Sequence, residues 1–193
     1  DNLLLLVNQM LDLRKLESGN LKLELKQIDI IKFLNYLCES FQSLAEVQHK
    51  QFHFLSSEDE IWMDIDQVKL GQIINNLFSN ALKFTTEKDH IYIQVDKKEG
   101  VVEKLLIRIK DTGMGIPEDK VSKIFERFYQ VDDSMTRQGD GTGIGLTLVS
   151  EFVGLMHGDI QVKSKLGQGT TFHIVLPITR EAPRAETSLE GSS

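Results

Sequence analysis

Three polar residues, Asn76, Asn80 and Lys83, recur at intervals of four and three within a segment whose other positions are largely apolar. In a helix, this spacing places the three side chains on one face. An amide oxygen can ligate Mg²⁺ when nucleotide phosphates supply most of the negative charge, and a neighbouring lysine can contact a phosphate oxygen. The segment is therefore either part of a nucleotide site or a solvated helix face.

A second candidate segment, Asp111-Thr112-Gly113-Met114-Gly115-Ile116-Pro117, directly follows an apolar stretch that predicts a strand. A carboxylate there can accept a hydrogen bond from the exocyclic amino group of adenine, whereas guanine presents an oxygen at that point. The two glycines would let a flat base approach the backbone closely. An ordinary strand-to-helix turn is the alternative for so short a pattern.

Glycines also alternate along Gly139 to Gly145, directly before a segment with helical periodicity. Backbone amides without obstructing side chains, followed by a helix N-terminus, favour phosphate binding. The spacing differs from G-x-x-x-x-G-K-[ST] and from G-x-G-x-x-G, so standard P-loop and Rossmann sites lose support. The nearby segment Phe125-Glu126-Arg127-Phe128-Tyr129 is expected to pack both phenylalanines in the core, and Arg127 or Arg137 could reach a γ-phosphate.

The apolar pattern predicts the elements that must position these residues. Asp29 and Asp66 are each expected to cap the helix that follows, and Gly19 to end the first helix. Neighbouring antiparallel strands mixed with helices predict an α+β fold, a two-layer sandwich preceded by one long helix. Helices are expected at 1–18, 30–48, 68–82 and 144–156, and strands at 21–25, 52–55, 61–63, 91–95, 105–109, 159–165 and 170–178.

Composition limits the function classes that remain. The 193 residues are 40% hydrophobic, enough for one sizeable core, and the net charge of -7 argues against a dedicated nucleic-acid-binding protein. The single cysteine, Cys38, excludes an internal disulfide, favours a reducing compartment and is expected to be inert. No apolar run reaches the length of a membrane span, although a membrane anchor could precede residue 1.

In this order, five motifs resemble those of the ATP-binding domain of sensor histidine kinases, in the superfamily shared with DNA gyrase, Hsp90 and MutL. The resemblance covers about residues 29–178 and implies the Bergerat-type ATP-binding fold. The motifs are the N box (76–85), the first glycine box (111–115), the F box (125–129), the second glycine box (141–146) and the closing Gly167-Gln168-Gly169-Thr170-Thr171-Phe172.

The resemblance implies roles for individual residues. Asn76 would ligate Mg²⁺, Asn80 and Lys83 would contact phosphates, Phe84 would lie against adenine, and Asp111 would accept a hydrogen bond from its amino group. The first three would form the catalytic set, with ATP and Mg²⁺ as cofactors. Further ATP contacts are implied for Gly113, Gly115, Ile116, Arg137, Gly141, Thr142, Gly143, Ile144, Gly145, Leu146 and Thr170.

The resemblance also implies the organisation and partners of the parent protein. Residues 1–20 would be the second helix of a dimerisation and phosphoacceptor hairpin, 21–178 the catalytic ATP-binding domain, and 179–193 a linker or tail. The expected activity is transfer of the γ-phosphoryl of Mg·ATP to a histidine on the hairpin helix that this sequence lacks. The expected partners are a second copy, through the hairpin helices, and a response regulator or receiver domain. The expected location is a cytoplasmic domain of a membrane-anchored bacterial sensor, with no nucleic acid bound and no direct membrane contact.

Two alternatives remain open. An ATPase of the gyrase, Hsp90 or MutL kind would resemble the same fold but places a glutamate base where this chain has Asn76, whose amide cannot accept the proton. A non-catalytic nucleotide-binding module is the other alternative. Gln130 keeps it open, because the family often has arginine after the F-box tyrosine. The five histidines lack the context of a phosphoacceptor and are expected to be structural.

Overall fold

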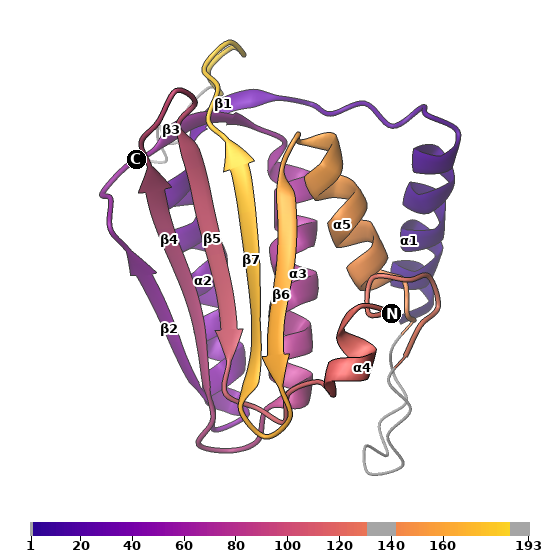
Figure 1. Ribbon diagram of the computed structural model, residues 1–193. Helices are drawn as coiled ribbons and strands as arrows, with labels where there is room; N and C mark the ends of the chain where they lie inside the picture. Colours follow the sequence, from indigo (N-terminus) through magenta and orange to yellow (C-terminus); the bar gives the residue numbers. More distant parts are fainter. Residues whose placement is uncertain (1, 131–141, 186–193) are drawn as a thin grey trace, which may run out of the picture.

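The computed structural model describes residues 2–130 and 142–185 (Figure 1). Helices and strands mix along the chain in the order that the sequence predicts, with one short additional helix. The elements are α1 (Asn2–Glu17), β1 (Lys26–Asp29), α2 (Ile30–Val47), β2 (Gln51–Ser56), β3 (Trp62–Ile65), α3 (Gln67–Phe84), β4 (His90–Lys98), β5 (Lys104–Asp111), α4 (Glu118–Val121), α5 (Gly145–Leu155), β6 (Asp159–Lys165) and β7 (Gly169–Pro177).

Five strands form the main sheet in the order β2-β4-β5-β7-β6. The pair β2 and β4 is parallel, and the other pairs are antiparallel. Helices α2, α3 and α5 lie against one face of this sheet (Figure 1). Alternate residues of β4 and β5, such as Ile93 and Ile107, are fully buried between the two layers. The predicted α+β two-layer sandwich is confirmed.

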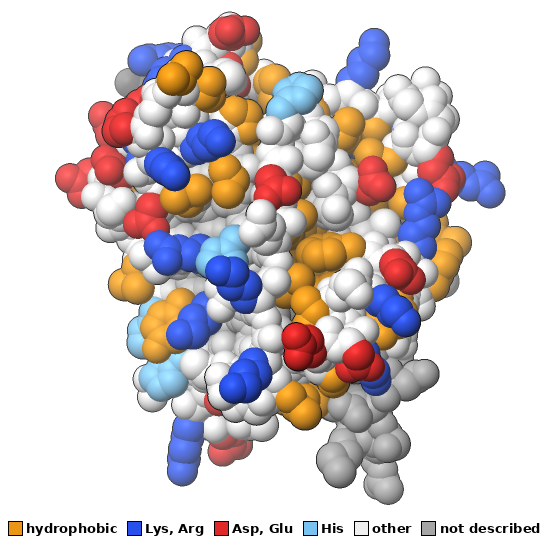
Figure 2. Space-filling model, viewed as in Figure 1, with side chains coloured by type: hydrophobic (Ala, Val, Ile, Leu, Met, Phe, Trp, Pro, Cys, Tyr) orange, Lys and Arg blue, Asp and Glu red, His pale blue; other side chains and the backbone are white. Residues whose placement is uncertain are grey.

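Within residues 2–130 and 142–185, no helix lies over the opposite face of the sheet (Figure 1). Figure 2 shows this face, on which lysine, arginine and histidine side chains gather over the central strands. One of its cations, Arg108 on β5, is paired with Asp96 on β4. The described helices α2, α3 and α5 therefore lie on the other face of the sheet. Strand β5 ends at Asp111, the first residue of the first glycine box.

The two predicted helix caps are confirmed, and both also tie distant segments together. Asp29 Oδ1 accepts a hydrogen bond from the amide of Ile31, at 3.1 Å, and one from Ile61, at 3.2 Å. Asp66 Oδ1 accepts from the amide of Lys69, at 3.0 Å, and its Oδ2 accepts from Glu24, at 2.9 Å. Each carboxylate thus satisfies a free N–H of a first helical turn and fixes a neighbouring loop.

The strand predicted at 21–25 is wrong. The chain there has no regular structure, and the strand lies at Lys26–Asp29, where it pairs antiparallel with β3. Leu21 and Leu23 do pack against the core, which explains the alternating pattern. Alternation reports which side chains face the core, whereas a strand also needs a neighbouring backbone to bond with, and β3 supplies one only from Lys26 onward.

Residues 179–185 lie against the two-stranded sheet, which differs from the expected end of the fold at residue 178. The Thr179 hydroxyl and the Glu181 amide donate to Asp64 Oδ2 at 2.9 and 2.6 Å. Gln27 exchanges backbone hydrogen bonds with this segment, donating to the Pro183 carbonyl and accepting from the Ala185 amide. The polar composition of the segment gave no sign of these backbone contacts.

Helix α1 lies beside α5 (Figure 1) and is fixed to the helix layer by a polar cluster. Lys69 Nζ of α3 lies 3.1 Å from both carboxylate oxygens of Asp12, and Gln72 donates to Asp12 Oδ2 at 3.1 Å. Leu13 is buried beside this cluster, whereas other apolar side chains of the helix stay exposed: Leu4, Val7, Met10 and Leu11. One face of α1 therefore packs on this chain, and a second apolar face does not.

Candidate functional site

The candidate site begins with Asp111, the last residue of β5, whose side chain is 7% exposed. Its Oδ1 accepts hydrogen bonds from the amides of Gly113, at 2.9 Å, and Thr170, at 3.3 Å. Burial raises the pKa of this carboxyl to about 6, although the two backbone hydrogen bonds act in the opposite direction and lower the pKa. The carboxylate is thus oriented by two backbone donors and costly to keep charged without a ligand.

Two glycines allow the backbone to close around Asp111. A Cβ added to Gly113 would lie 2.1 Å from the Phe84 carbonyl oxygen, and one added to Gly169 would lie 2.1 Å from the Asp111 carbonyl oxygen. Gly169 also has a φ of +85°, a conformation that side chains disfavour. At Gly113 the group that approaches closely is the backbone at the end of α3, so the approach of a flat base to Gly113 and Gly115 stays a prediction.

The end of α3 and the closing hairpin complete this part of the site. The Met114 amide donates to the Phe84 carbonyl at 3.1 Å, and the Phe84 ring is 38% exposed. The Ile116 amide donates to Ser164 Oγ at 2.8 Å, and that hydroxyl shares a hydrogen bond with Thr170 Oγ1 at 2.9 Å. Phe84, Ile116 and Thr170, predicted separately, are therefore linked to the Asp111 loop.

Asn76 and the start of α5 form the second part of the site. The Asn76 side-chain NH₂ donates to the Gln72 carbonyl at 2.8 Å, one turn back on α3. This bond leaves Oδ1 directed toward Gly145, where an added Cβ would lie 2.7 Å from it. No side chain among the described residues caps the start of α5. A side-chain amide oxygen therefore lies beside the start of a helix, where backbone N–H groups can receive an anion.

Asn80 and Lys83 continue the same face of α3, as their spacing predicts. Asn80 is half-buried, and Lys83 is exposed, with its Nζ 5.4 Å from the centre of the Phe84 ring. The opposite face of the helix carries its buried residues, among them Ile74, Leu77 and Phe78. The polar face thus runs from Asn76 toward the end of the helix that contacts the Asp111 loop.

The segment before α5 contacts the F box and α1. Gly143 has a φ of +67°, and its carbonyl accepts from the Phe128 amide at 2.9 Å. The Thr142 hydroxyl donates to Gln9 of α1 at 3.1 Å and accepts from the Ile144 amide. Ile144 itself is buried and Leu146 half-buried against the core. The described part of the second glycine box is thus tied to both neighbouring elements.

The F box differs from its prediction in one respect. Phe125 is half-buried and packs edge-on against Phe172, but Phe128 is 62% exposed, so only one of the two phenylalanines lies in the core. A φ of +60° at Phe128 turns its side chain away from the core. Arg127 forms an ion pair with Glu17 of α1. Arg137 and Gly141, two of the predicted ATP contacts, lie outside the described residues.

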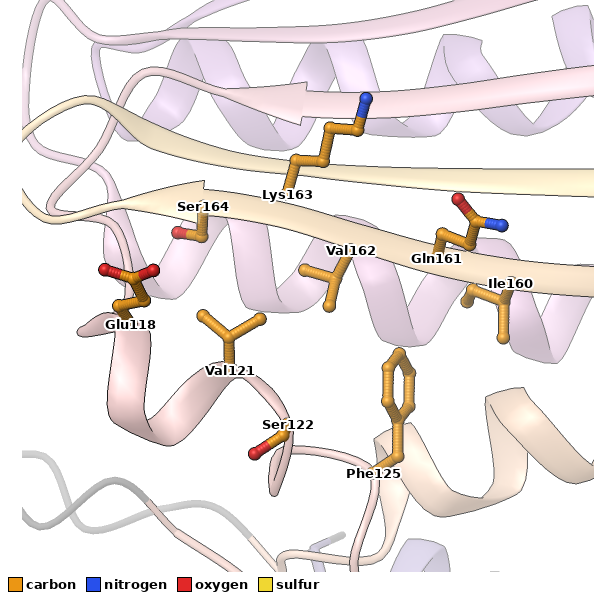
Figure 3. A pocket seen from close by; sticks show the side chains of 9 residues that line it. All are labelled: Glu118, Val121, Ser122, Phe125, Ile160, Gln161, Val162, Lys163 and Ser164. Atoms are coloured by element: carbon orange, nitrogen blue, oxygen red, sulfur yellow. The ribbon is translucent and has the colours of Figure 1, made fainter.

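A groove of about 660 Å³ lies between α4 and the edge strand β6 (Figure 3). Its walls are apolar where Val121 and Phe125 face Ile160 and Val162, with Glu118 and Lys163 at the margins. None of the predicted nucleotide contacts lines this groove, so it is not the candidate site. Two residues that no sequence motif singled out also support the site: Asp89, which bonds to Thr112 of the predicted segment, and Ser164.

Comparison with known proteins identifies the family. The family model of histidine kinase-, DNA gyrase B- and HSP90-like ATPases matches residues 65–180. The sensor histidine kinase WalK of Bacillus subtilis is 37% identical over 181 residues, covering 94% of this chain and 29% of WalK. The circadian input-output histidine kinase CikA of Synechococcus elongatus is 34% identical, covering 92% of this chain and 23% of CikA. The chain thus spans less than a third of these relatives.

Solved structures agree with this assignment. Full-length ShkA in complex with AMPPNP superposes with a TM-score of 0.80 at 30% identity, over 93% of this chain and 36% of ShkA. The catalytic domain of the histidine kinase ThkA superposes with a TM-score of 0.70 over 82% of this chain and 100% of that domain, and at 21% identity this likeness concerns the fold alone. The chain belongs to the histidine kinase-, DNA gyrase B- and HSP90-like ATPase family and is the catalytic ATP-binding domain of a sensor histidine kinase.

Proposed function

We propose that this domain binds Mg·ATP between the Asp111 loop and the start of α5, and transfers the γ-phosphoryl group to a histidine on the partner helix of α1. The observation that supports the proposal is that a carboxylate and an amide oxygen lie beside α3 at two different levels, Asp111 near its C-terminal end and Asn76 on the helix itself. An oriented, buried carboxylate lies near its C-terminal end, and an amide oxygen facing a helix N-terminus lies two turns earlier. A purine nucleotide has matching chemistry at its two ends.

At the adenine end, Asp111 would accept a hydrogen bond from the exocyclic amino group. Its Oδ1 already receives two backbone amides, so the carboxylate is held in place before a ligand arrives. Phe84, on the end of α3 bonded to the same loop, offers an exposed ring for apolar contact with the base. Gly113, Gly115, Ile116 and Thr170 would shape the remaining walls. Guanine would be disfavoured, because it presents an oxygen to the carboxylate.

At the phosphate end, Asn76 Oδ1 would ligate Mg²⁺, and Asn80 and Lys83 would contact phosphate oxygens. An amide oxygen is a ligand type that Mg²⁺ accepts, and phosphate oxygens and water would supply its remaining ligands. The backbone of Thr142, Gly143, Ile144, Gly145 and Leu146 would surround the phosphates. Gly141 and Arg137 would add to this set. The ion would neutralise charge that develops on the transferred group.

The reaction requires positioning more than covalent chemistry from this domain. Phosphoryl transfer is accelerated mainly by alignment of the nucleophile and by stabilisation of charge. A histidine nitrogen is itself the nucleophile, so no group on α3 has to remove a proton from water. Asn76 stands where the related ATPases carry a glutamate base and cannot take that role. We therefore expect ATP hydrolysis by the isolated chain below about 0.1 s⁻¹, under the ordinary enzyme range.

The partners follow from α1. We propose that residues 1–20 are the second helix of a dimerisation hairpin, that 21–178 together with the packed residues 179–185 form the catalytic unit, and that the residues beyond 185 are a linker or tail. The exposed apolar stripe of α1 supports pairing with the hairpin helices of a second copy. A response regulator or receiver domain would take the phosphoryl group from the histidine.

The parent protein would be a membrane-anchored sensor with this domain in the cytoplasm. No helix among the described residues has the length and apolarity needed to cross a bilayer.

The direct test of the site is titration of the chain with Mg·ADP. Asp111→Asn should bind at least tenfold more weakly than the wild type, because one charged base-recognition hydrogen bond is disturbed, about 1.4 kcal/mol. Asp159→Asn is the matched control, since this carboxylate is exposed at the start of β6 and, among the described residues, accepts a side-chain hydrogen bond from its neighbour Gln161. Equal affinities of wild type and Asp111→Asn would refute the adenine role.

The non-catalytic alternative needs a different measurement, because a regulatory module would also bind ADP. Gln130 follows the F-box tyrosine where the family often has arginine, which bears on γ-phosphate contact rather than on ADP. Transfer of phosphate to an added acceptor helix separates the two functions, and its absence despite tight nucleotide binding would favour the module.

A further inference from the structure

A hydrogen-bonded cluster around Asp89 lies beside the adenine end of the site. Asp89 belongs to the loop between α3 and β4 and is half-buried. Its Oδ2 accepts hydrogen bonds from the Thr86 amide, at 2.7 Å, and from the Thr86 hydroxyl, at 2.8 Å. Its Oδ1 accepts from the Thr112 hydroxyl at 3.1 Å. One carboxylate thus joins the loop after α3 to the loop after β5.

Thr112 is held from three sides. Its backbone amide donates to the His90 carbonyl at 3.1 Å, its hydroxyl accepts from the His90 amide at 2.9 Å, and the same hydroxyl donates to Asp89. This residue stands between Asp111 and Gly113, the two residues proposed to meet the base. Any displacement of Thr112 therefore moves the carboxylate or the glycine on either side of it.

The other side of the cluster reaches the end of α3. Lys50 Nζ donates to the Leu82 carbonyl and to Gln48 Oε1, and it attracts Asp89 electrostatically. Phe84, two residues after Leu82, is bonded through its carbonyl to the Met114 amide. Lys50 and Asp89 therefore fix the two segments that bracket the proposed adenine site, one from each side.

Resting on the nucleotide site proposed above, we propose that Asp89 is a positioning residue, which holds the Asp111–Gly113 backbone and the end of α3 in the geometry that receives adenine. It acts through Thr112 and Thr86 and does not itself touch the nucleotide. The contact with Thr112 joins residues 23 positions apart and therefore fixes tertiary geometry, whereas the contacts with Thr86 close the turn that ends at Asp89.

Charge gives the cluster a second effect. The charged and titratable groups that act on Asp89 are Lys50, His90 and Asp111. Burial alone would raise the pKa of Asp89, but hydrogen bonds from Thr86 and Thr112 and the charge of His90 hold it below its ordinary value. The carboxylate of Asp89 therefore stays ionised, and its charge adds to the burial that raises the pKa of Asp111. Removing that charge lowers the pKa of Asp111.

The test compares three variants in Mg·ADP titrations between pH 5 and 8. Asp89→Ala removes the ties and the charge, Asp89→Asn removes the charge and keeps an oxygen that can accept, and Thr112→Val removes the hydroxyl alone. We expect Asp89→Ala and Thr112→Val to weaken ADP binding threefold to tenfold. We expect both Asp89 variants, but not Thr112→Val, to shift the acid loss of binding to lower pH. Asp159→Ala is the control and should match the wild type.

The double variant Asp89→Ala/Thr112→Val separates positioning from general destabilisation. If Asp89 acts through Thr112, the ADP affinity of the double variant should be close to that of whichever single variant binds ADP more weakly. Both substitutions break the same chain of contacts, so their effects should not add. Additive losses, or wild-type affinity in Asp89→Ala, would overturn the proposal. Failure of wild type to bind ADP, or equal binding by Asp111→Asn, would instead refute the proposed site, so the two failures are distinguishable.

Discussion

At the scale of single residues, the conflict between binding and stability is concentrated in Asp111. Its carboxyl is buried, and the two amides that donate to it only partly offset the loss of hydration, so its pKa rises to about 6 from 3.8. A raised pKa means that the folded state prefers the protonated acid. The contribution of Asp111 to the free energy of unfolding is therefore complete below about pH 4 and is lost as the pH rises through about 6. At neutral pH, the empty site holds a charge that the fold disfavours.

Replacing this residue should consequently stabilise the chain while it weakens nucleotide binding. Without nucleotide at pH 7, Asp111→Asn should be more stable than the wild type, by as much as about 3 kcal/mol if the whole pKa shift is recovered. Below about pH 4 the advantage should disappear, because the wild-type carboxyl is then protonated. Urea denaturation of both proteins at pH 3.5 and 7 measures this, and a wild type that is the more stable protein at pH 7 would contradict it.

Some residues of the proposed site could be predicted from the sequence, and others could not. Asp111, Gly113 and Asn76 could be predicted, because a few consecutive residues show both the type of side chain and its expected position after a strand or on a helix face. Asp89 and Ser164 could not. Their roles depend on partners brought together by the fold, such as Thr112 for Asp89 and Ile116 for Ser164, and nothing in their immediate neighbours indicates those contacts.

At the scale of elements, the site depends on how α5 begins against α3. Gly145, the first residue of α5, leaves just enough room for the Asn76 side chain, and an added Cβ would lie 2.7 Å from its amide oxygen. The four longer helices, α1, α2, α3 and α5, were predictable from periodicity, with caps for α2 and α3, whereas the four-residue helix α4 was not. The strand expected at 21–25 was not, because its apolar alternation arises from side chains packed on the core without a partner strand.

Two glycines of α5 provide a matched pair of substitutions. Gly145→Ala should push Asn76 away from the start of the helix and weaken Mg·ATP binding at least fivefold, with little change in stability. Gly154→Ala has no atom within 4 Å of the added Cβ, so it should leave binding unchanged and stabilise the helix by about 0.5 kcal/mol. Calorimetric titration and thermal unfolding of both variants measure this. Equal nucleotide affinities would show that Asn76 and the helix start do not share a ligand.

At the scale of the whole molecule, α1 contacts three parts of the proposed nucleotide site. It is bonded to α3 through Asp12, to the F box through Glu17 and to the second glycine box through Gln9. A helix that touches each of these segments can align an acceptor with the phosphates. The sequence predicted a helix at 1–18 but not the contacts that it makes, since ion pairs between distant segments leave no local pattern.

Phosphoryl transfer to an acceptor helix distinguishes a histidine kinase centre from any other nucleotide site. The chain should be incubated with Mg·ATP labelled at the γ-phosphate and a hairpin that contains the family's histidine, with Asn76→Ala as the inactive control. We predict label on the hairpin that is stable to alkali and labile to acid, as expected for phosphohistidine, and none with the control or without the hairpin. Rapid ATP hydrolysis without labelled hairpin, or equal labelling by Asn76→Ala, would contradict the assignment of this site as a histidine kinase centre.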